Sequence, residues 1–252
     1  MNVKFVIPSY NRSDLIKKKT LSLCKRLNIN FNDIYVFIIK EDEDNYKNSL
    51  CDLRINIIVV DIPSGLHHMR NYITKYFPEK TLLLSLDDDI NDIYKLVNDN
   101  TLTQITSSEF NTFLYDSFQI CLDNSIGLFG VYPVKNAYFM KDSPEKTYKL
   151  KFCVGAFWGC INNHNIHINI EEKEDFERTI QFYIENNKIL RINNICVATN
   201  YYKNKGGMQT NTNRIENSKI SSEYLIRTYP KYCKFNRIKK SGIHEVKLRI
   251  VD

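Results

Sequence analysis

The stretch TLLLSLDDDIND, residues 81–92, ends a run of apolar residues with three consecutive aspartates. Neighbouring carboxylates repel one another, and each makes the next harder to ionise unless a cation, a hydrogen-bond donor or water relieves the repulsion. The apolar run indicates a buried strand, and the aspartates stand at its carboxyl end. The pattern therefore predicts that a positive group lies beside the end of this strand.

Outward from this stretch, apolar segments alternate with amphipathic ones through the first half of the chain. Strand-like runs rich in Val and Ile are separated by segments whose apolar residues fall near one helical face. This alternation is typical of an α/β fold with a mostly parallel central sheet flanked by helices. The predicted strands are 3–8, 34–39, 55–60, 81–86 and 126–132. One predicted helix begins at Ser13, and two others cover 67–77 and 107–122.

The second half of the chain follows a different pattern. A polar, proline-containing excursion occupies residues 136–150, and an apolar, glycine-spaced segment follows it. A C-terminal extension to the sheet is therefore expected. Its predicted elements are a helix at 171–187, a long strand at 189–199, a helix at 216–228 and a short alternating strand at 245–251.

Length and composition predict one soluble intracellular domain over residues 1–252. The chain of 252 residues is 43% hydrophobic, which is enough for one sizeable core. The apolar run in the amino-terminal MNVKFVIPSYN is too short for a signal peptide, and no segment reaches the roughly 18 apolar residues of a membrane helix. Seven cysteines without a C-x-x-C pair favour reduced, buried thiols over disulfides or a zinc ribbon.

The formal charge of +6 and the pI near 8.8 are compatible with a polyanionic partner such as nucleic acid. Basic residues interleave with aromatic ones in KTYKLKF at 146–152 and in KYCKFNRIKK at 231–240. Such mixtures suit phosphates and stacked bases. The alternative is a solvated surface that happens to carry a few tyrosines.

Three polar motifs follow predicted strands: PSYNR after the first, KEDED after the second and DDD after the fourth. Ligands of open α/β sheets bind outside the carboxyl ends of the strands, so these motifs are expected to form one site. Alternation along an extended chain turns Asp87 and Asp89 to the same side. Two carboxylates with room for water and phosphate oxygens suit Mg²⁺ or Mn²⁺ better than zinc.

Taken in order, these motifs resemble those of GT-A nucleotide-sugar glycosyltransferases. The resemblance covers about residues 1–186 and rests on VIPSYNR, the strand-ending acid Glu41, GLHHMRN at 65–71, the DDD cluster and the pair Glu174–Asp175. Within that superfamily, KTLSL after the first motif and GGM at 206–208 look like the TET/JBP-associated glycosyltransferases. That group includes the base J glucosyltransferase and viral relatives.

On the donor side, the resemblance implies a UDP-sugar with a divalent cation on Asp87 and Asp89. Asp88 would accept hydrogen bonds from sugar hydroxyls, and Arg70 would face the diphosphate. The same resemblance implies a nucleoside pocket formed by Pro8, Ser9, Tyr10, Arg12 and the acid Glu41, although Asp42, Glu43 and Asp44 leave the choice of acid open. The alternatives are a polar strand end with a capping aspartate, a solvated acidic loop, and a surface salt bridge for Arg70.

On the acceptor side, an inverting transfer needs a base, for which we take Asp175 first and Glu174 second. Acids in the first turn of a helix are also favoured by the helix dipole, which is the alternative for both. The resemblance places Trp158, Gly206 and Gly207 against the acceptor, with a buried core position as the alternative for Trp158. A late histidine completes the metal shell in some GT-A enzymes, which makes His244 the candidate here.

The resulting expectation is a metal-dependent hexosyltransferase that moves glucose from UDP-glucose to a hydroxymethylpyrimidine in DNA, such as hydroxymethyluracil. Residues 1–92 would bind the nucleotide sugar, and residues 93–252 would form the acceptor side. If the protein is viral, it would act in the nucleus or cytoplasm of the host. The alternatives are a glycan or protein acceptor, a metal-dependent nuclease or phosphatase, and a non-catalytic nucleic-acid-binding module.

Overall fold

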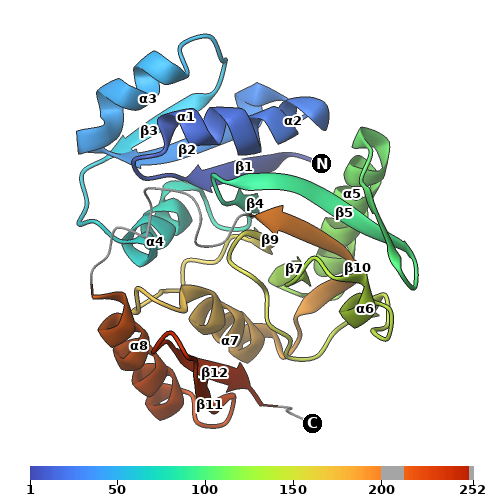
Figure 1. Ribbon diagram of the computed structural model, residues 1–252. Helices are drawn as coiled ribbons and strands as arrows, with labels where there is room; N and C mark the ends of the chain where they lie inside the picture. The colour runs from blue at the N-terminus through green and yellow to red at the C-terminus, as the bar shows by residue number, and fades with distance from the viewer. Residues whose placement is uncertain (200–212, 250–252) are drawn as a thin grey trace.

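A computed structural model describes residues 1–199 and 213–249 of the chain. Its centre is a 10-stranded sheet in the order β3-β2-β1-β4-β9-β7-β10-β5-β6, with β8 paired to β10 (Figure 1). The strands are β1 (Val3–Pro8), β2 (Ile34–Ile39), β3 (Asn56–Val60), β4 (Leu82–Leu86), β5 (Ile90–Asn98), β6 (Thr101–Gln104), β7 (Leu128–Tyr132), β8 (Lys146–Thr147), β9 (Phe157–Ile161) and β10 (Leu190–Thr199).

The amino-terminal half of the sheet is parallel, as the sequence predicts. β1 pairs in parallel with both β2 and β4, and β2 pairs in parallel with β3. These strands are almost entirely apolar because helices cover both of their faces. Their carboxyl ends therefore meet at one edge, where the chain continues as 9–12, 40–42 and 87–89.

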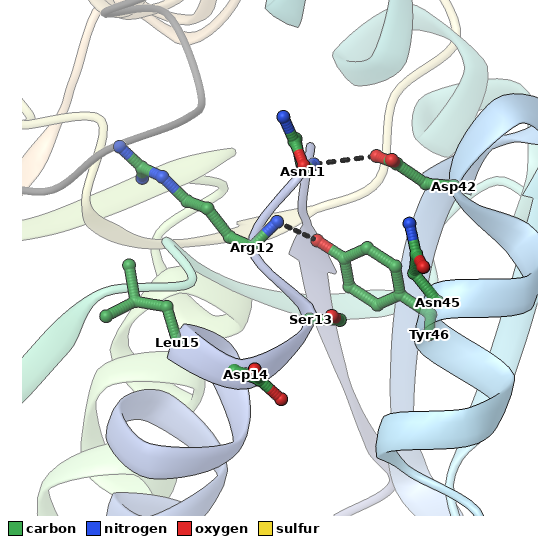
Figure 2. Close-up of a pocket in the computed structure, with 8 residues that line it drawn as sticks. All are labelled: Asn11, Arg12, Ser13, Asp14, Leu15, Asp42, Asn45 and Tyr46. Carbon is green, nitrogen blue, oxygen red and sulfur yellow. Dashed lines mark hydrogen bonds between the residues drawn. The ribbon is translucent and has the colours of Figure 1, made fainter.

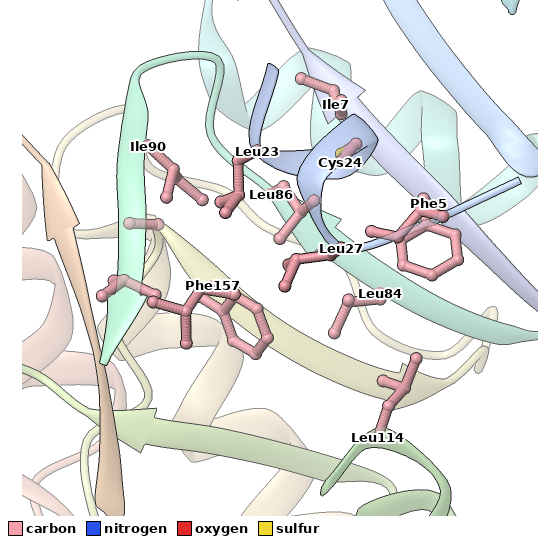
Figure 3. Packing of buried hydrophobic residues seen from close by; sticks show 14 of the residues in the cluster. Phe5, Ile7, Leu23, Cys24, Leu27, Leu84, Leu86, Ile90, Leu114 and Phe157 are labelled. Atoms are coloured by element: carbon pink, nitrogen blue, oxygen red, sulfur yellow. The ribbon is translucent and has the colours of Figure 1, made fainter. Parts of the chain in front are cut away.

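One face of the sheet is covered by the helices that follow β1 and by the long helix α5 (Ser107–Asp123). The chain after β1 forms α1 (Ser13–Ile16), a π-helical turn Lys17–Leu21 and α2 (Ser22–Arg26). Their apolar side chains pack against strand residues in the larger of the buried clusters (Figure 3). This packing anchors the segment that carries Arg12 to the segment that carries the aspartates.

The opposite face is covered by α4 (Leu66–Tyr76) and α7 (Glu174–Asn186). Met69 and Ile73 of α4 and Phe182 of α7 share a buried cluster with Trp158 of β9. The cysteines of the chain are free, and all except Cys51 are buried. None of the described helices is long and apolar enough to cross a membrane.

The structure differs from the sequence-based expectation after the aspartates, after β2 and at β9. Residues 90–104 form the antiparallel pair β5 and β6, so the aspartates precede a strand and not a capped helix. The expected acidic loop after β2 forms a 3-10 turn at Lys40–Asp42 and then the helix α3 (Glu43–Ser49). β9 is antiparallel to both of its neighbours, β4 and β7.

The C-terminal part of the chain packs beside α7 (Figure 1). It consists of α8 (Arg214–Thr228) and an antiparallel ribbon of β11 (Cys233–Ile238) and β12 (His244–Leu248). Leu225, Cys233 and Val246 form a small core of their own with Ile170 and Ile180. The sequence predicts α8 and the strand at β12, whereas β11 was recognised only as a basic segment.

Candidate active site

The backbone of the aspartate turn is held by two neighbouring segments. The Asp87 N–H donates to the Ala156 carbonyl at 3.0 Å, which attaches the turn to the chain just before β9. The buried Thr20 hydroxyl donates to the Asp87 carbonyl at 2.7 Å and accepts from the Ile90 N–H at 3.1 Å. The three carboxylates therefore stand on a fixed turn, as a preorganised ligand site requires.

Arginines supply the positive charge that the sequence predicts at the end of β4. Arg12 lies 2.8 Å from an Asp88 oxygen and 3.5 Å from an Asp89 oxygen. Arg70 donates to Asp87 at 3.1 Å from the other side. Both arginines come from segments that the sequence assigns to the site, so the folded chain brings 9–12, 65–71 and 87–89 together.

The carboxylates differ in how open they are to a ligand. Asp87 keeps 35% of its side-chain surface exposed, whereas the values for Asp88 and Asp89 are 6% and 12%. Burial raises the pKa of Asp87; Arg70 opposes this rise, and the neighbouring carboxylates of Asp89 and Asp88 add to it. Burial also raises the pKa of Asp88, against the effect of Arg12. An additional cation near Asp87 would relieve this repulsion.

Within residues 1–199 and 213–249, no group of three or more His, Cys, Asp or Glu side chains is arranged to hold a metal ion. A site built on Asp87 and Asp89 therefore offers the two carboxylates and leaves further positions to water or to phosphate oxygens. This donor set fits Mg²⁺ and Mn²⁺, which protein sites commonly hold through one or two carboxylates together with substrate phosphates.

A cavity of about 280 Å³ lies between the chain after β1 and the residues after β2 (Figure 2). The Asn11 N–H donates to Asp42 at 2.6 Å, and the Arg12 N–H donates to the Tyr46 hydroxyl at 3.0 Å. These bonds join the chain after β1 to α3. The residues that line the cavity are Asn11, Arg12, Ser13, Asp14, Leu15, Asp42, Asn45 and Tyr46.

A hydrogen-bonded chain connects the cavity to the aspartates. The buried Ser9 hydroxyl lies 2.5 Å from the Tyr46 hydroxyl and donates to Asp88 at 2.6 Å. Burial is the main cause of the raised pKa of Tyr46, so the phenol stays neutral and can donate. Pro8 ends β1 as a buried residue, whereas Tyr10 is 38% exposed.

The structure places the first two acids after β2 in different surroundings. Glu41 is exposed and is not among the residues that line the cavity, whereas the buried Asp42 lines it. Tyr46 was also missed, because residues 40–46 were expected to form a loop. The signal in the sequence is the spacing of Asp42 and Tyr46, since residues four apart share one face of a helix.

Arg70 and Trp158 are core residues of the site. Arg70 is 4% exposed, and it donates to Ser85, to Asp87 and, at 3.3 Å, to the Gly155 carbonyl. The surface salt bridge considered for Arg70 is therefore wrong, because the arginine itself is buried. Trp158 is 7% exposed, with the Arg178 and Arg70 guanidinium carbons 4.0 and 5.4 Å from its ring centroid. An acceptor cannot stack on this ring, so the structure supports the core alternative for Trp158.

The amino terminus of α7 brings Glu174 and Asp175 to the same site. The Gly155 N–H donates to Asp175 at 3.2 Å, and the Gly155 carbonyl accepts from Arg70. The Gly155 peptide thus lies between Asp175 and Arg70, the arginine that binds Asp87. A Cβ at residue 155 would lie 3.1 Å from a Glu174 oxygen and 3.5 Å from an Asp175 oxygen, so glycine permits this close approach.

The two acids have different partners. Glu174 is 4% exposed, accepts from Arg178 at 2.6 Å and lies 3.9 Å from Arg70. Asp175 accepts only backbone N–H bonds, from Gly155 and Phe176, among the bonds described for its carboxylate. Burial and then the charge of Glu174 raise the pKa of Asp175 to about 7. A carboxylate with a pKa near neutrality suits general-base chemistry.

The remaining predicted residues lie elsewhere. His244 begins β12, where its ring lies 6.1 Å from that of Phe235, and it does not join Asp87 and Asp89 in a metal-binding group within the described chain. The assignment of His244 to the metal shell stays a prediction. Gly206 and Gly207 fall outside the described residues.

No family model matches the chain, and no curated protein matches it in sequence. Solved structures match it in fold. TarS 1-349 of S. aureus aligns with a TM-score of 0.51 and 12% identity, over 90% of this chain and 66% of its own. The mannosyltransferase PcManGT from Pyrobaculum calidifontis, in complex with GDP-Man and Mn²⁺, aligns with a TM-score of 0.54 and 12% identity, over 91% of this chain and 64% of its own. Glucosyl-3-phosphoglycerate synthase from Mycobacterium tuberculosis, in complex with Mg²⁺ and UDP, aligns with a TM-score of 0.53 and 12% identity, over 100% of this chain and 88% of its own.

These similarities show that the chain has the GT-A glycosyltransferase fold, which confirms the fold predicted from the sequence. The narrower resemblance to the TET/JBP-associated group stays a prediction. The chain covers 66% of TarS 1-349 and 64% of the mannosyltransferase, and so spans less than two thirds of either.

Proposed function

We propose that this protein is a metal-dependent glycosyltransferase that moves a sugar from a UDP-sugar to a hydroxyl acceptor with inversion. One observation carries the proposal. Arg12 lines a cavity at the ends of β1 and β2 and lies 3.5 Å from Asp89. Arg70 binds Asp87 and also the Gly155 peptide, whose N–H donates to Asp175, a carboxylate of raised pKa. A nucleotide-sugar transferase needs these features together, whereas a nuclease or phosphatase has no need of a nucleoside cavity.

The cavity is proposed to hold the nucleoside of the donor. A uracil presents one N–H donor between two carbonyls, and Asp42 is the acid in the cavity wall that could accept from this N–H. The Asn11 and Asn45 side chains supply amide groups that could bind the carbonyls or the ribose. Asp42 thus takes the role that the resemblance assigned to Glu41.

The diphosphate is proposed to lie against Asp87, Asp89 and the two arginines. When Mg²⁺ or Mn²⁺ is bound there, it neutralises the charge that develops on the departing diphosphate. Arg70 and Arg12 already stand within ion-pair distance of the aspartates, so they are placed to contact phosphate oxygens as well. Asp88, held by Ser9 and Arg12, keeps the position proposed for binding sugar hydroxyls.

Asp175 is proposed as the general base. The acceptor oxygen attacks the anomeric carbon from the face opposite the diphosphate, and its proton passes to Asp175 as UDP departs with the bonding electron pair. Glu174 is less suited to the role because Arg178 holds its carboxylate in a buried ion pair. Its charge nevertheless raises the pKa of Asp175.

We further propose glucose as the sugar and a 5-hydroxymethylpyrimidine in DNA, such as hydroxymethyluracil, as the acceptor. The narrower family resemblance supports this choice, and so do the net charge of +6 and the basic segments at 146–152 and 231–240. A base inside the duplex must be extruded to reach the site, at a cost of a few kcal/mol that phosphate contacts offset. A glycan or protein hydroxyl is the alternative acceptor.

The donor half of the proposal is tested by slow hydrolysis of UDP-glucose without acceptor. Turnover should vanish with a chelator, return with Mn²⁺ or Mg²⁺, and stay absent in Asp89→Ala at ordinary metal concentrations. Asp99→Ala, in the exposed turn between β5 and β6, is the matched control and should behave like the wild type. Full turnover by Asp89→Ala would remove this residue from the metal site.

The acceptor half is tested with radiolabelled UDP-glucose and paired DNA duplexes that differ only in hydroxymethylation. Label on the hydroxymethylated duplex alone supports the proposal. Label on neither duplex, together with transfer to a glycan or protein, would replace the DNA acceptor while leaving the donor site in place. Cleavage of either duplex without sugar consumption would favour a nuclease.

A further inference from the structure

The ribbon of β11 and β12 carries an unusual share of the charge of the protein. Residues 231–249 contain seven basic side chains and the single acid Glu245, so their formal charge of +6 equals that of the whole chain. The sequence indicates only the first part of this surface, at 231–240. Lys247 and Arg249 join it because β12 pairs back onto β11.

The charges on the ribbon are not all equivalent. Arg237 and Lys239 both bind Glu245, at 2.7 and 2.8 Å, so this acid offsets part of their charge. Lys234 and Lys247 lie directly opposite each other across the two strands, and both are exposed. Neither has an ion-pair partner among residues 1–199 and 213–249. Like charges directly opposite in a sheet are destabilising, so a bound anion would stabilise this pair.

The two faces of the ribbon are distinct. Cys233 and Val246 are buried against Leu225 of α8, which fixes the inner face. Lys234 and Lys247 lie one residue away along their strands, and alternation turns them to the outer face. Phe235 pairs with Val246 and therefore lies on the inner face, although it is 46% exposed. The outer face thus presents free lysine cations, which suit phosphate groups.

Two hydrogen bonds connect the ribbon to the start of α7. The Ser218 hydroxyl donates to the His244 carbonyl at 3.2 Å, and the Lys173 ammonium donates to the same hydroxyl at 2.6 Å. Lys173 immediately precedes Glu174 and Asp175. α8, which carries Ser218, thus links the ribbon to the residue before the proposed base (Figure 1).

We propose that the outer face of this ribbon, centred on Lys234 and Lys247, is a docking surface for the phosphodiester backbone of a nucleic acid. The inference deepens the proposed function, on which it rests for the identity of the acceptor. A two-stranded ribbon fits the major groove of B-DNA, and its ammonium groups pair with the flanking phosphates. A face that inserts into a membrane would instead be broad and apolar. Apart from Phe235 and Ile238, the large hydrophobic side chains between 231 and 249 are not exposed.

The test measures binding of a short fluorescein-labelled duplex by anisotropy, with a chelator and without sugar donor, over a range of salt concentrations. Lys234→Gln/Lys247→Gln should lower the slope of log affinity against log salt by about two, because each phosphate contact contributes about one. The loss should be the same for unrelated DNA sequences. Removing the like-charge pair should leave the unfolding free energy of the variant at or above that of the wild type, which verifies that the variant is folded.

Lys25→Gln/Lys188→Gln is the matched control, because both lysines are exposed and lie outside the ribbon. It should keep the wild-type slope. An unchanged slope in the ribbon variant overturns the proposal, and so does ribbon-dependent binding to phosphatidylserine vesicles without binding to DNA. Because the assay contains neither donor nor metal, ribbon-dependent DNA binding without sugar transfer to DNA would support the docking surface and contradict the proposed acceptor.

Discussion

Glu174 and Asp175 are neighbours in the sequence but have different electrostatic surroundings. Glu174 forms a buried ion pair with Arg178, whereas Asp175 accepts bonds from the backbone of Gly155 and Phe176. The other charged groups near Asp175 are Arg178, which lowers its pKa, and Lys173 at the helix start. The charge of Glu174 raises the pKa of Asp175, which favours Asp175 as the proposed base.

Asp175→Asn should therefore separate chemistry from binding. The amide keeps the size and hydrogen-bonding capacity of the side chain but cannot take the proton, so the transfer rate should fall by about 10²- to 10⁴-fold. UDP affinity, measured by calorimetry, should stay near the wild-type value. In the wild type, transfer should rise with pH through about 7, because the base must lose its proton first. Glu174→Gln should move this midpoint to lower pH.

A transfer rate unchanged in Asp175→Asn would assign the base to another group. The matched control is Asp123→Asn, an exposed acid at the end of α5, which should keep both the rate and the midpoint.

Trp158 is the residue whose position in the structure differs most from its predicted role. Its ring lies between Arg70 and Arg178 in the core. Trp158→Ala should lower the unfolding free energy by about 3–5 kcal/mol, as is typical of a large aromatic side chain removed from a core. The milder Trp158→Phe should keep the KM for acceptor. Tyr115→Ala, on the exposed face of α5, should change neither quantity. A raised acceptor KM in a fully stable Trp158→Phe would restore the stacking role.

At the scale of elements, a buried carboxylate joins α7 to α8. Glu177 is fully buried, and neutral groups supply its described hydrogen bonds. The Tyr224 and Tyr229 hydroxyls each donate to it at 3.2 Å, and the backbone and side chain of Asn169 donate at 2.8 and 2.9 Å. Burial, followed by the charge of Glu177, raises the pKa of both tyrosines. The bonds hold the C-terminal helix and its ribbon against the helix that bears Asp175.

Glu177→Leu should weaken this junction. It leaves partly buried donors without their acceptor, and a fully buried unsatisfied donor costs about 1–3 kcal/mol, so the unfolding free energy should fall by about 2 kcal/mol in a denaturant titration. Glu185→Leu, at an exposed position of the same helix, should have little effect. Equal stability of the two variants would show that the apolar contacts of α8 hold the junction without the carboxylate.

At the scale of the whole molecule, the carboxylates of Asp87, Asp88 and Asp89 repel one another, and a bound ligand with its metal ion should relieve this repulsion. UDP with Mn²⁺ is expected to raise the unfolding free energy by about 2.7 kcal/mol at a hundredfold excess over the Kd, because it binds only the folded chain. The increase should depend on the metal in the wild type and lose that dependence in Asp89→Ala. The increase is measured by thermal unfolding in three conditions: with UDP alone, with Mn²⁺ alone and with both. Identical stabilisation by UDP with and without metal would contradict a shared site.

Much of the fold could be predicted because its signals are local. The apolar runs that form β1, β2 and β4 are complete in the sequence, and their bounds match the structure closely. Thr106 and Glu109 form a capping box that starts α5 within one turn, close to the predicted start of that helix. β5 was missed because its polar positions mask the strand pattern next to the aspartates.

The sequence by itself determined the parallel half of the sheet and the meeting of PSYNR, KEDED and DDD at one edge. Hydrophobic periodicity sets the strands, and parallel pairing brings their carboxyl ends together. Only the tertiary structure placed Asp42 and not Glu41 in the cavity wall, buried Trp158 in the core and gathered the C-terminal cations on one ribbon. Burial, partner and pKa depend on side chains from distant segments, and the spacing of residues along the chain does not contain that information.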